Sequence, residues 1–142
     1  MSCCLRKKLK KCTMENIPLY DFKNENRLCK VLSVYDGDTI TIAIKLETKI
    51  YKWKVRMYGY DSPEMKPLKI LKNRDDIKRR ALIAKKALED KILEKIVTIE
   101  LLGFDKYGRI LGNIYYNNEN INEYMLKNDY GYSYIGGTKR TI

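Results

Sequence analysis

At residues 56–64 the chain reads Arg-Met-Tyr-Gly-Tyr-Asp-Ser-Pro-Glu, a stretch in which a predicted strand breaks at Gly59 and two carboxylates follow within four residues. Pro63 fixes its own φ and restricts the residue before it to extended geometry, so Asp61 and Glu64 are expected on a stiff corner. Carboxylates held in this way can bind a hard cation such as Ca²⁺, which prefers oxygen ligands. A polar turn that closes a strand is the other interpretation of this stretch, and the rest of the chain decides between them.

Three β-strands are predicted before this corner, because apolar and polar residues alternate in them. They cover residues 28–35, 39–44 and 50–58. Asp36-Gly37, between the first two strands, favours a tight hairpin turn, and Asp38 follows that turn. In the third strand the apolar side chains are expected on one face, and the opposite face carries Lys52, Lys54 and Arg56.

A helix is predicted after the corner, beginning near Asn73, with Asp75 and Asp76 in its first turn, where acidic residues are favourable. Its expected buried stripe recurs at helical spacing and consists of Ile77, Ala81, Ala84, Leu88 and Ile92. The remaining elements are expected to be strands at 94–102 and 110–116 and a short helix at 121–128.

This order of elements predicts a β-rich α+β domain, a five-stranded OB-like barrel with two to three helices packed at one end. The domain is expected to cover residues 25–142. Residues 1–24 are expected to form a basic tail and an apolar arm, the arm lying at 17–22 and packing across the domain.

The charge balance favours a polyanionic partner. The chain holds 29 Lys and Arg against 18 Asp and Glu, a net charge of +11. Nucleic acid is the first candidate partner and an anionic membrane surface the second. The sequence has no histidine, which excludes histidine general bases, Ser/His and Cys/His nucleophilic pairs, and histidine zinc ligands. Any catalysis therefore has to use carboxylates, Lys, Tyr, Cys or a metal ion.

The cysteines and the N-terminal charges concern location. The four cysteines form no C-x-x-C pair, so neither a zinc site nor a disulfide framework is predicted. Residues 1–12 hold five cations but no apolar run typical of a signal peptide or a membrane span, so an intracellular soluble protein is the default expectation. Cys3 and Cys4 beside this basic run also fit reversible S-acylation with attachment to anionic lipid; a solvated tail is the other interpretation.

Three separated segments carry a family resemblance. They are Tyr35-Asp36-Gly37-Asp38-Thr39, the corner at 56–64, and Asp105-Lys106-Tyr107-Gly108-Arg109. Together they resemble the staphylococcal nuclease family, the calcium-dependent thermonucleases, and the likeness extends over residues 28–139. Residues 121–123 and 131–139 also look like the family's second helix and glycine-rich close. One Asp-Gly-Asp motif alone is a weak signal, but three segments in order within an independently predicted barrel are specific.

The resemblance implies a Ca²⁺-dependent nuclease that hydrolyses DNA or RNA with little sequence preference. Asp38 and Asp61 would be the carboxylate ligands of one Ca²⁺. Ser62, which stands where the family usually has Thr, would lend its backbone carbonyl to the metal. Glu64 would be the general base that activates or positions the attacking water.

The resemblance also implies groups that bind the substrate. Arg56 and Arg109 match the two arginines that clamp the phosphate, since guanidinium forks bind phosphate oxygens bidentately. Lys106 and Tyr107 would lie beside the phosphate, and Tyr134 is the preferred one of three C-terminal tyrosines for stacking a base. Single strands are expected to enter more easily than duplexes, and the protein is expected to be a monomer.

The alternative function is that of a non-catalytic OB-like module that keeps a basic groove and binds nucleic acid or protein without cutting it. Degenerate relatives of this kind typically lose an acid or an arginine from the site. This chain has lost neither, which favours the enzyme. The sequence leaves open whether DNA or RNA is preferred and whether cleavage is internal or from an end.

Overall fold

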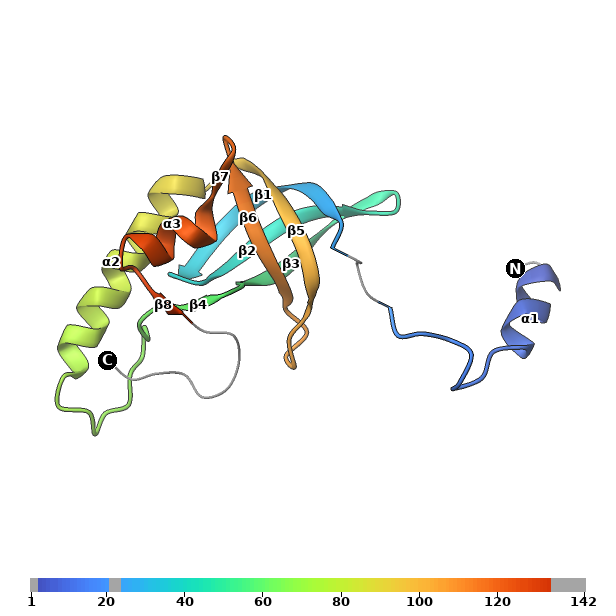
Figure 1. Ribbon diagram of the computed structural model, residues 1–142, viewed down its shortest axis with the longest axis horizontal. Helices are drawn as coiled ribbons and strands as arrows, with labels where there is room; N and C mark the ends of the chain where they lie inside the picture. The colour runs from blue at the N-terminus through green and yellow to red at the C-terminus, as the bar shows by residue number, and fades with distance from the viewer. Residues whose placement is uncertain (1–2, 21–23, 134–142) are drawn as a thin grey trace.

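A computed structural model describes residues 3–20 and 24–133 of the chain. Five strands form a barrel: β1 (Asn26–Asp36), β2 (Thr39–Leu46), β3 (Lys49–Met57), β5 (Ile96–Phe104) and β6 (Ile110–Tyr116). Neighbours in the order β3-β2-β1-β5-β6 pair antiparallel (Figure 1). A parallel pairing of β3 with β6, with Val55 opposite Ile110, closes the sheet. The predicted OB-like barrel is therefore confirmed, and a two-residue strand, β7 (Glu119–Asn120), pairs antiparallel with the end of β6.

Two helices cover one end of the barrel. The long helix α2 (Arg74–Ile92) begins after Asn73, and its buried residues are the five that the helical spacing predicted. The short helix α3 (Ile121–Lys127) begins at Asn120, whose side chain accepts a hydrogen bond from the backbone N–H of Glu123 at 3.1 Å. This cap satisfies one of the backbone donors that the first turn of a helix leaves unpaired.

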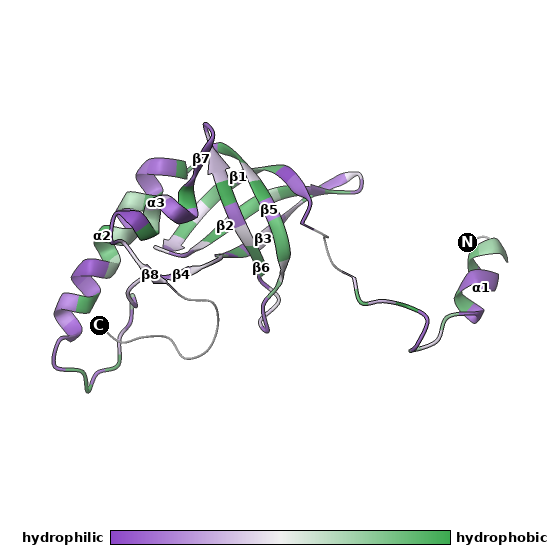
Figure 2. Cartoon of the chain, viewed as in Figure 1, coloured by the Kyte–Doolittle hydropathy of each residue, from purple (hydrophilic) through white to green (hydrophobic). Residues whose placement is uncertain are grey.

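One side of each barrel strand is buried, as the alternation predicted. Figure 2 shows apolar and polar residues interspersed along these strands. On β2 the side chains of Ile40, Ile42 and Ile44 are at most 1% exposed. Each fully buried isoleucine contributes about 1.5–3 kcal/mol relative to an exposed one. On β3 Val55 and Met57 are buried, and this rigid half of the strand leads directly into the corner at residues 58–64.

The corner contains a short strand that the sequence did not indicate. After Gly59, which has a φ of +93°, β4 (Tyr60–Asp61) pairs antiparallel with β8 (Tyr132–Ser133) near the end of the described chain. The two strands approach so closely that a β-carbon on Gly131 would lie 2.6 Å from Cδ2 of Tyr60. Only glycine at position 131 permits this approach, and the pairing of β8 with β4 therefore holds the corner in place.

The N-terminal segment differs from the expected tail and arm. Residues 3–10 form a helix, α1 (Cys3–Lys10), of which no residue is buried, and Figure 1 shows it apart from the barrel. Leu19 is 94% exposed and Tyr20 is 70% exposed, so the described part of the arm does not pack across the domain as expected. No helix within residues 3–20 and 24–133 has the length and apolarity needed to cross a membrane.

Candidate active site

The β1–β2 hairpin places Asp38 in the interior of the protein. Asp36 pairs with Thr39, so Gly37 and Asp38 are the two residues of the turn, and Asp38 lies within the turn rather than after it. The backbone N–H of Asp38 donates to Oδ1 of Asp36 at 3.0 Å. A β-carbon on Gly37 would lie 2.6 Å from Cβ of Ser62 and 2.8 Å from Cβ of Ala84. The glycine therefore lets the turn touch both the corner and α2.

Arg56 joins two buried carboxylates. Its Nη2 lies 3.5 Å from Oδ2 of Asp38 and also contacts Oδ1 of Asp61. Asp38 is 2% exposed and Asp61 is 1% exposed. Nη1 of Arg56 donates to the backbone carbonyls of Met57 at 2.8 Å and Tyr60 at 2.9 Å. One guanidinium thus pairs with two desolvated acids, which leaves one net negative charge, and fixes the backbone of the corner.

Tyr60 and Ser62 lock the corner against the hairpin turn. The buried hydroxyl of Tyr60 donates to the carbonyl of Gly37 at 2.6 Å, and the backbone N–H of Ser62 donates to Oδ2 of Asp38 at 2.8 Å. Burial, followed by the negative charge of Asp38, raises the pKa of Tyr60, so this hydroxyl stays a donor. The hydroxyl oxygen of Ser62 is buried and has no hydrogen-bond partner among the described residues.

Glu64 lies at the exposed end of the corner, after Pro63. Within the described ranges no three Asp, Glu or Cys side chains are grouped closely enough to hold a metal ion. Glu64 therefore does not join Asp38 and Asp61 as a third close carboxylate. Its exposure, three residues from Asp61, suits a group that meets solvent and substrate.

Arg109 is held by a carboxylate in the β5–β6 turn. Its Nε donates to Oδ2 of Asp105 at 2.6 Å, and the backbone N–H groups of Tyr107 and Arg109 each donate to Oδ1 of Asp105 at 2.9 Å. Burial alone would raise the pKa of Asp105, but these hydrogen bonds and the guanidinium charge outweigh it, and the pKa is lowered. The carboxylate therefore holds both the turn and the arginine.

The barrel seam brings Arg109 toward Arg56. Arg56 pairs with Leu111 across the parallel β3–β6 seam, and Arg109 is two residues before Leu111, directly before β6 begins. Ideal sheet spacing, continued by one residue beyond β6, gives about 8 Å between the Cα atoms of the two arginines. Two extended guanidinium side chains can therefore reach one group placed over the seam.

Two of the three substrate-binding candidates, Lys106 and Tyr107, lie among the residues that the structure describes. The ring of Tyr107 is 72% exposed, with Nζ of Lys106 at 5.2 Å and the guanidinium carbon of Arg109 at 5.5 Å from its centroid. The site residues that the structure brings into contact are Asp38, Arg56, Asp61 and Ser62. Tyr134 lies outside the described residues, and its stacking role stays a prediction.

Asn122 supports the seam, a role that was not assigned to it from the sequence. The side chain is 4% exposed; its Oδ1 accepts from the backbone N–H of Ile114 at 2.9 Å. Its Nδ2 donates to the carbonyls of Tyr58 at 2.8 Å and Gly112 at 3.0 Å. A polar residue at a core position of a short helix was the available signal, because a buried amide needs partners. Tyr60 was missed because nothing in its local sequence distinguishes a core tyrosine from a surface one.

Comparison with known proteins shows which family the chain belongs to. Residues 54–139, more than half of the chain, match the family described as "Staphylococcal nuclease homologue". The chain belongs to this family. Among relatives of this staphylococcal nuclease homologue, a Haemophilus influenzae protein described as "Uncharacterized endonuclease" is 33% identical over 110 residues, which cover 78% of this chain and 54% of that protein.

Two further relatives come from other kingdoms of life. An uncharacterized protein of Methanocaldococcus jannaschii is 31% identical over 131 residues, 79% of this chain and 61% of that protein. A "Staphylococcal-like nuclease" of Arabidopsis thaliana is 34% identical over 89 residues, 63% of this chain and 24% of that protein. This staphylococcal nuclease homologue therefore spans less than two thirds of the length of each of these relatives.

Proposed function

We propose that this chain is a Ca²⁺-dependent nuclease that hydrolyses phosphodiester bonds of DNA or RNA with little sequence preference. The observation that carries the proposal is the contact of Arg56 with both Asp38 and Asp61 in a buried corner, next to the strand that follows Arg109. The descriptions of two relatives as endonuclease and staphylococcal-like nuclease point to the same reaction class.

The donor chemistry of the corner fits Ca²⁺. Asp38 and Asp61 offer hard carboxylate oxygens, and the Ser62 hydroxyl is a further buried oxygen without a described partner. Ca²⁺ takes about six to eight oxygen ligands, so backbone carbonyls, that of Ser62 included, and water would complete the set. Bound Ca²⁺ would supply positive charge beside the substrate phosphate and favour deprotonation of a nearby water. A cation bound to these carboxylates would compete with Arg56 for their oxygens. The guanidinium of Arg56 would then be available to bind phosphate.

The chain's own residues would carry the reaction as follows. Glu64 accepts a proton from a water molecule whose oxygen attacks the phosphorus; the bond from phosphorus to the leaving oxygen breaks, and that oxygen takes a proton from solvent water. Arg56 and Arg109 hold the charge that gathers on the phosphate oxygens in the transition state. Asp105 keeps the Arg109 fork oriented before substrate arrives, so less side-chain entropy is lost on binding. Tyr107, Lys106 and Tyr134 would bind the adjoining nucleotide.

The test is cleavage of plasmid and single-stranded DNA or RNA, with Ca²⁺ and with chelator. Glu64→Gln should lower the rate by about 10² to 10⁴, the usual contribution of a general base. Arg109→Lys keeps the charge but loses the fork, so a loss of about 10² is expected. Glu123→Gln, at an exposed acid of α3, and Arg79→Lys, at an exposed arginine of α2, are the matched controls.

Each part of the proposal has its own contrary outcome. Equal cleavage in chelator would remove the metal, and a wild-type rate in Glu64→Gln would remove that residue from the mechanism. If no condition gives cleavage while nucleic acid still binds, the non-catalytic module is the correct function.

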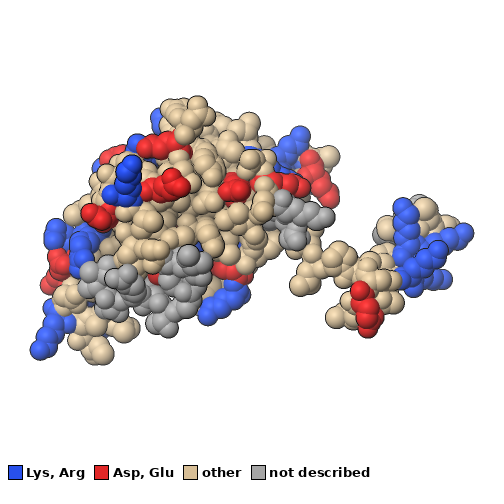
Figure 3. Space-filling view, in the orientation of Figure 1, with Lys and Arg blue, Asp and Glu red and all other residues tan. Residues whose placement is uncertain are grey.

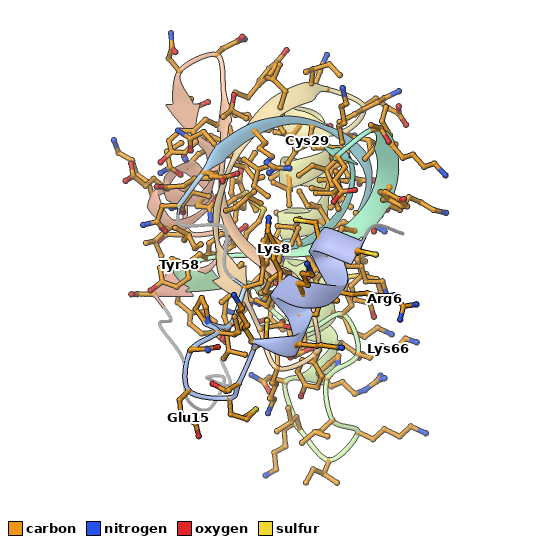
Figure 4. The ribbon with its side chains drawn as sticks, turned by 90° about the vertical axis from the view of Figure 1, so that its right-hand side faces the viewer. Arg6, Lys8, Glu15, Cys29, Tyr58 and Lys66 are labelled. Carbon is orange, nitrogen blue, oxygen red and sulfur yellow. The ribbon has the colours of Figure 1, made fainter. Side chains whose placement is uncertain are left out.

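We also propose that the N-terminal segment attaches the protein to an anionic membrane surface. Leu5 and Leu9, one helical turn apart on α1, are exposed, and so are the thiols of Cys3 and Cys4. Figure 3 shows cations concentrated on this segment, whereas acids and cations alternate over the barrel face in view, and Figure 4 shows Arg6 and Lys8 on the helix. Cations and an acyl chain together give stable anchoring, which one alone does not.

Mass analysis of protein from its native cell tests the acylation. Sedimentation with anionic and neutral vesicles tests the charge, with removal of residues 1–12 as the comparison. If Cys3 and Cys4 carry no acyl group and the protein binds anionic and neutral vesicles equally, the proposal is overturned.

A further inference from the structure

A row of cations runs along the outer face of β3, from Arg56 at the candidate active site toward the β2–β3 hairpin. Arg56, Lys54 and Lys52 alternate with inward or partly buried residues, so they share one face of the strand. Successive cations are two residues apart, about 6.6 Å along a strand. On β2, Lys45 lies opposite Ile50 and continues the row toward the hairpin end. We define Lys45, Lys52 and Lys54 as the β3 track.

The side chains that border the track on β1 and β2 are short, and two of them are polar. Thr41 lies opposite Lys54, and Ala43 lies opposite Lys52. Ser33 of β1 lies opposite Thr41, so short side chains, two of them with hydroxyl groups, extend across β1 and β2. On the other side of β3, Arg109 directly precedes Ile110, the residue of β6 that pairs with Val55, and Val55 is next to Lys54. A polymer can therefore approach the lysines without meeting a bulky side chain on β2.

The lysines of the track are also chemically available. Within the described residues none of the three forms an ion pair, whereas Lys30, Lys86 and Lys91 elsewhere on the surface each pair with an acid. No Asp or Glu occupies the β2 or β3 positions between Lys45 and Arg56 on this face. A row of unpaired lysines of this kind attracts a polyanion, because a single sign of charge dominates this face of the two strands.

We propose that the β3 track binds the sugar–phosphate backbone of a single-stranded nucleic acid beyond the phosphate held at the candidate active site. The spacing of the cations is comparable to the distance between phosphates in an extended single strand, and hydroxyl and lysine side chains are the usual contacts to phosphate and sugar. The bound nucleic acid runs from Arg56 along β3 toward the β2–β3 hairpin. The inference rests on the proposed function for its substrate class, but binding can be measured without cleavage.

The test compares two double variants with equal loss of charge. Lys52→Gln with Lys54→Gln removes two cations of the track, and Lys78→Gln with Lys85→Gln removes two cations from α2. Binding of a labelled single-stranded oligonucleotide of about 12 nucleotides, within the size range of an OB fold, is measured by fluorescence anisotropy in chelator. Thermal unfolding of each variant checks that it is folded.

The expected result follows from counterion release. Each phosphate contact on a single strand contributes about 0.7 to the slope of log K against log salt, so the track variant should lose about 1.4 from the slope. At about 0.1 M salt this corresponds to roughly 25-fold weaker binding. The α2 variant should keep the wild-type slope. Equal slopes for the two double variants would overturn the proposal, and so would an equal loss with duplex of the same length.

A second measurement separates this inference from the proposed function. If the chain cleaves nucleic acid, the track variant should raise KM for the oligonucleotide and leave KM for a dinucleotide unchanged, since a dinucleotide is too short to reach Lys52. If the chain does not cleave, the proposed function fails, while the salt slopes still confirm or overturn the track.

Discussion

Asn122 is the residue whose removal tests most directly how the barrel is closed. Asn122→Ala leaves the backbone N–H of Ile114 and the carbonyl of Tyr58 without their side-chain partner, while the carbonyl of Gly112 keeps a hydrogen bond from the backbone N–H of Tyr58 at 2.9 Å. The buried N–H of Ile114 left unpaired costs about 1–3 kcal/mol, and the lost hydrogen bond to the part-buried carbonyl of Tyr58 costs about 0.5–1.5 kcal/mol, so the free energy of unfolding should fall by about 1.5–4.5 kcal/mol. At about 4 °C per kcal/mol, Tm should fall by about 6–18 °C.

The assay is thermal and urea unfolding, with a control on the same helix. Nδ2 of Asn128 donates to the carbonyl of Tyr124 at 2.8 Å, but this residue is exposed. Asn128→Ala should therefore cost only about 0.5–1.5 kcal/mol, the net value of an ordinary hydrogen bond. If Asn122→Ala unfolds no more easily than Asn128→Ala, the seam does not depend on the buried amide.

A charge at the same position gives a second, signed readout. In Asn122→Asp the carboxyl group faces the carbonyls of Tyr58 and Gly112, so its pKa in the folded state is raised above the unfolded value of about 3.9. The folded state then favours the protonated form, and the variant loses stability as pH rises above about 4. We expect the difference in stability from wild type to be smaller near pH 4 than near pH 7, and a difference that does not change with pH would contradict the burial of this side chain.

Three further predictions concern the turn, the arginine clamp and the thiols. Gly37→Ala places a β-carbon 2.6 Å from Cβ of Ser62 and should cost about 1–3 kcal/mol, and adding Ser62→Gly should recover part of the loss in thermal unfolding. Asp105 has a lowered pKa, so its stabilisation is present above the ordinary value of 3.8 and is lost as pH falls through the folded pKa. The stability difference between wild type and Asp105→Asn should therefore vanish in acid unfolding experiments. Burial raises the pKa of Cys29 to about 12, so a thiol reagent at neutral pH should label Cys3, Cys4 and Cys12 rapidly and Cys29 only after unfolding, and four rapid thiols would contradict this.

The repeating parts of the fold could be predicted because each of them obeys a simple period. The isoleucines of β2 follow a period of two, and the buried residues of α2 follow a period close to 3.6, so burial of one face specifies the whole element. Strand order in the sequence then allowed few barrel topologies. Nothing of this kind marks β4 and β8, which are two residues long and pair across about 70 positions of chain.

The proximity of some candidate site residues was predictable, whereas the roles given to them stay predictions. Asp38, Arg56 and Asp61 meet as expected, because a tight turn and a proline corner leave short segments little freedom. The partner of Arg109 was missed, because Asp105 has the sequence of an ordinary β-turn, and a turn residue reveals its role only when its side chain is seen to accept three hydrogen bonds. The buried role of Asn122 depends on the distant carbonyl of Tyr58, and sequence spacing carries no such information.

The seam links stability to the proposed chemistry. Arg56 lies near the end of β3, and Arg109 directly precedes β6. The two arginines can therefore face one phosphate only while these strands stay paired. The β3–β6 pairing is short, covering three residue pairs, and Asn122 bonds to the backbone on both sides of it. A variant that loosens the seam should therefore lower kcat/KM even at temperatures where it remains folded, since a shift of about 1 Å in a catalytic group can cost 10² in rate. If Asn122→Ala, assayed well below its Tm, cleaves at the wild-type rate, the two arginines do not act as one clamp.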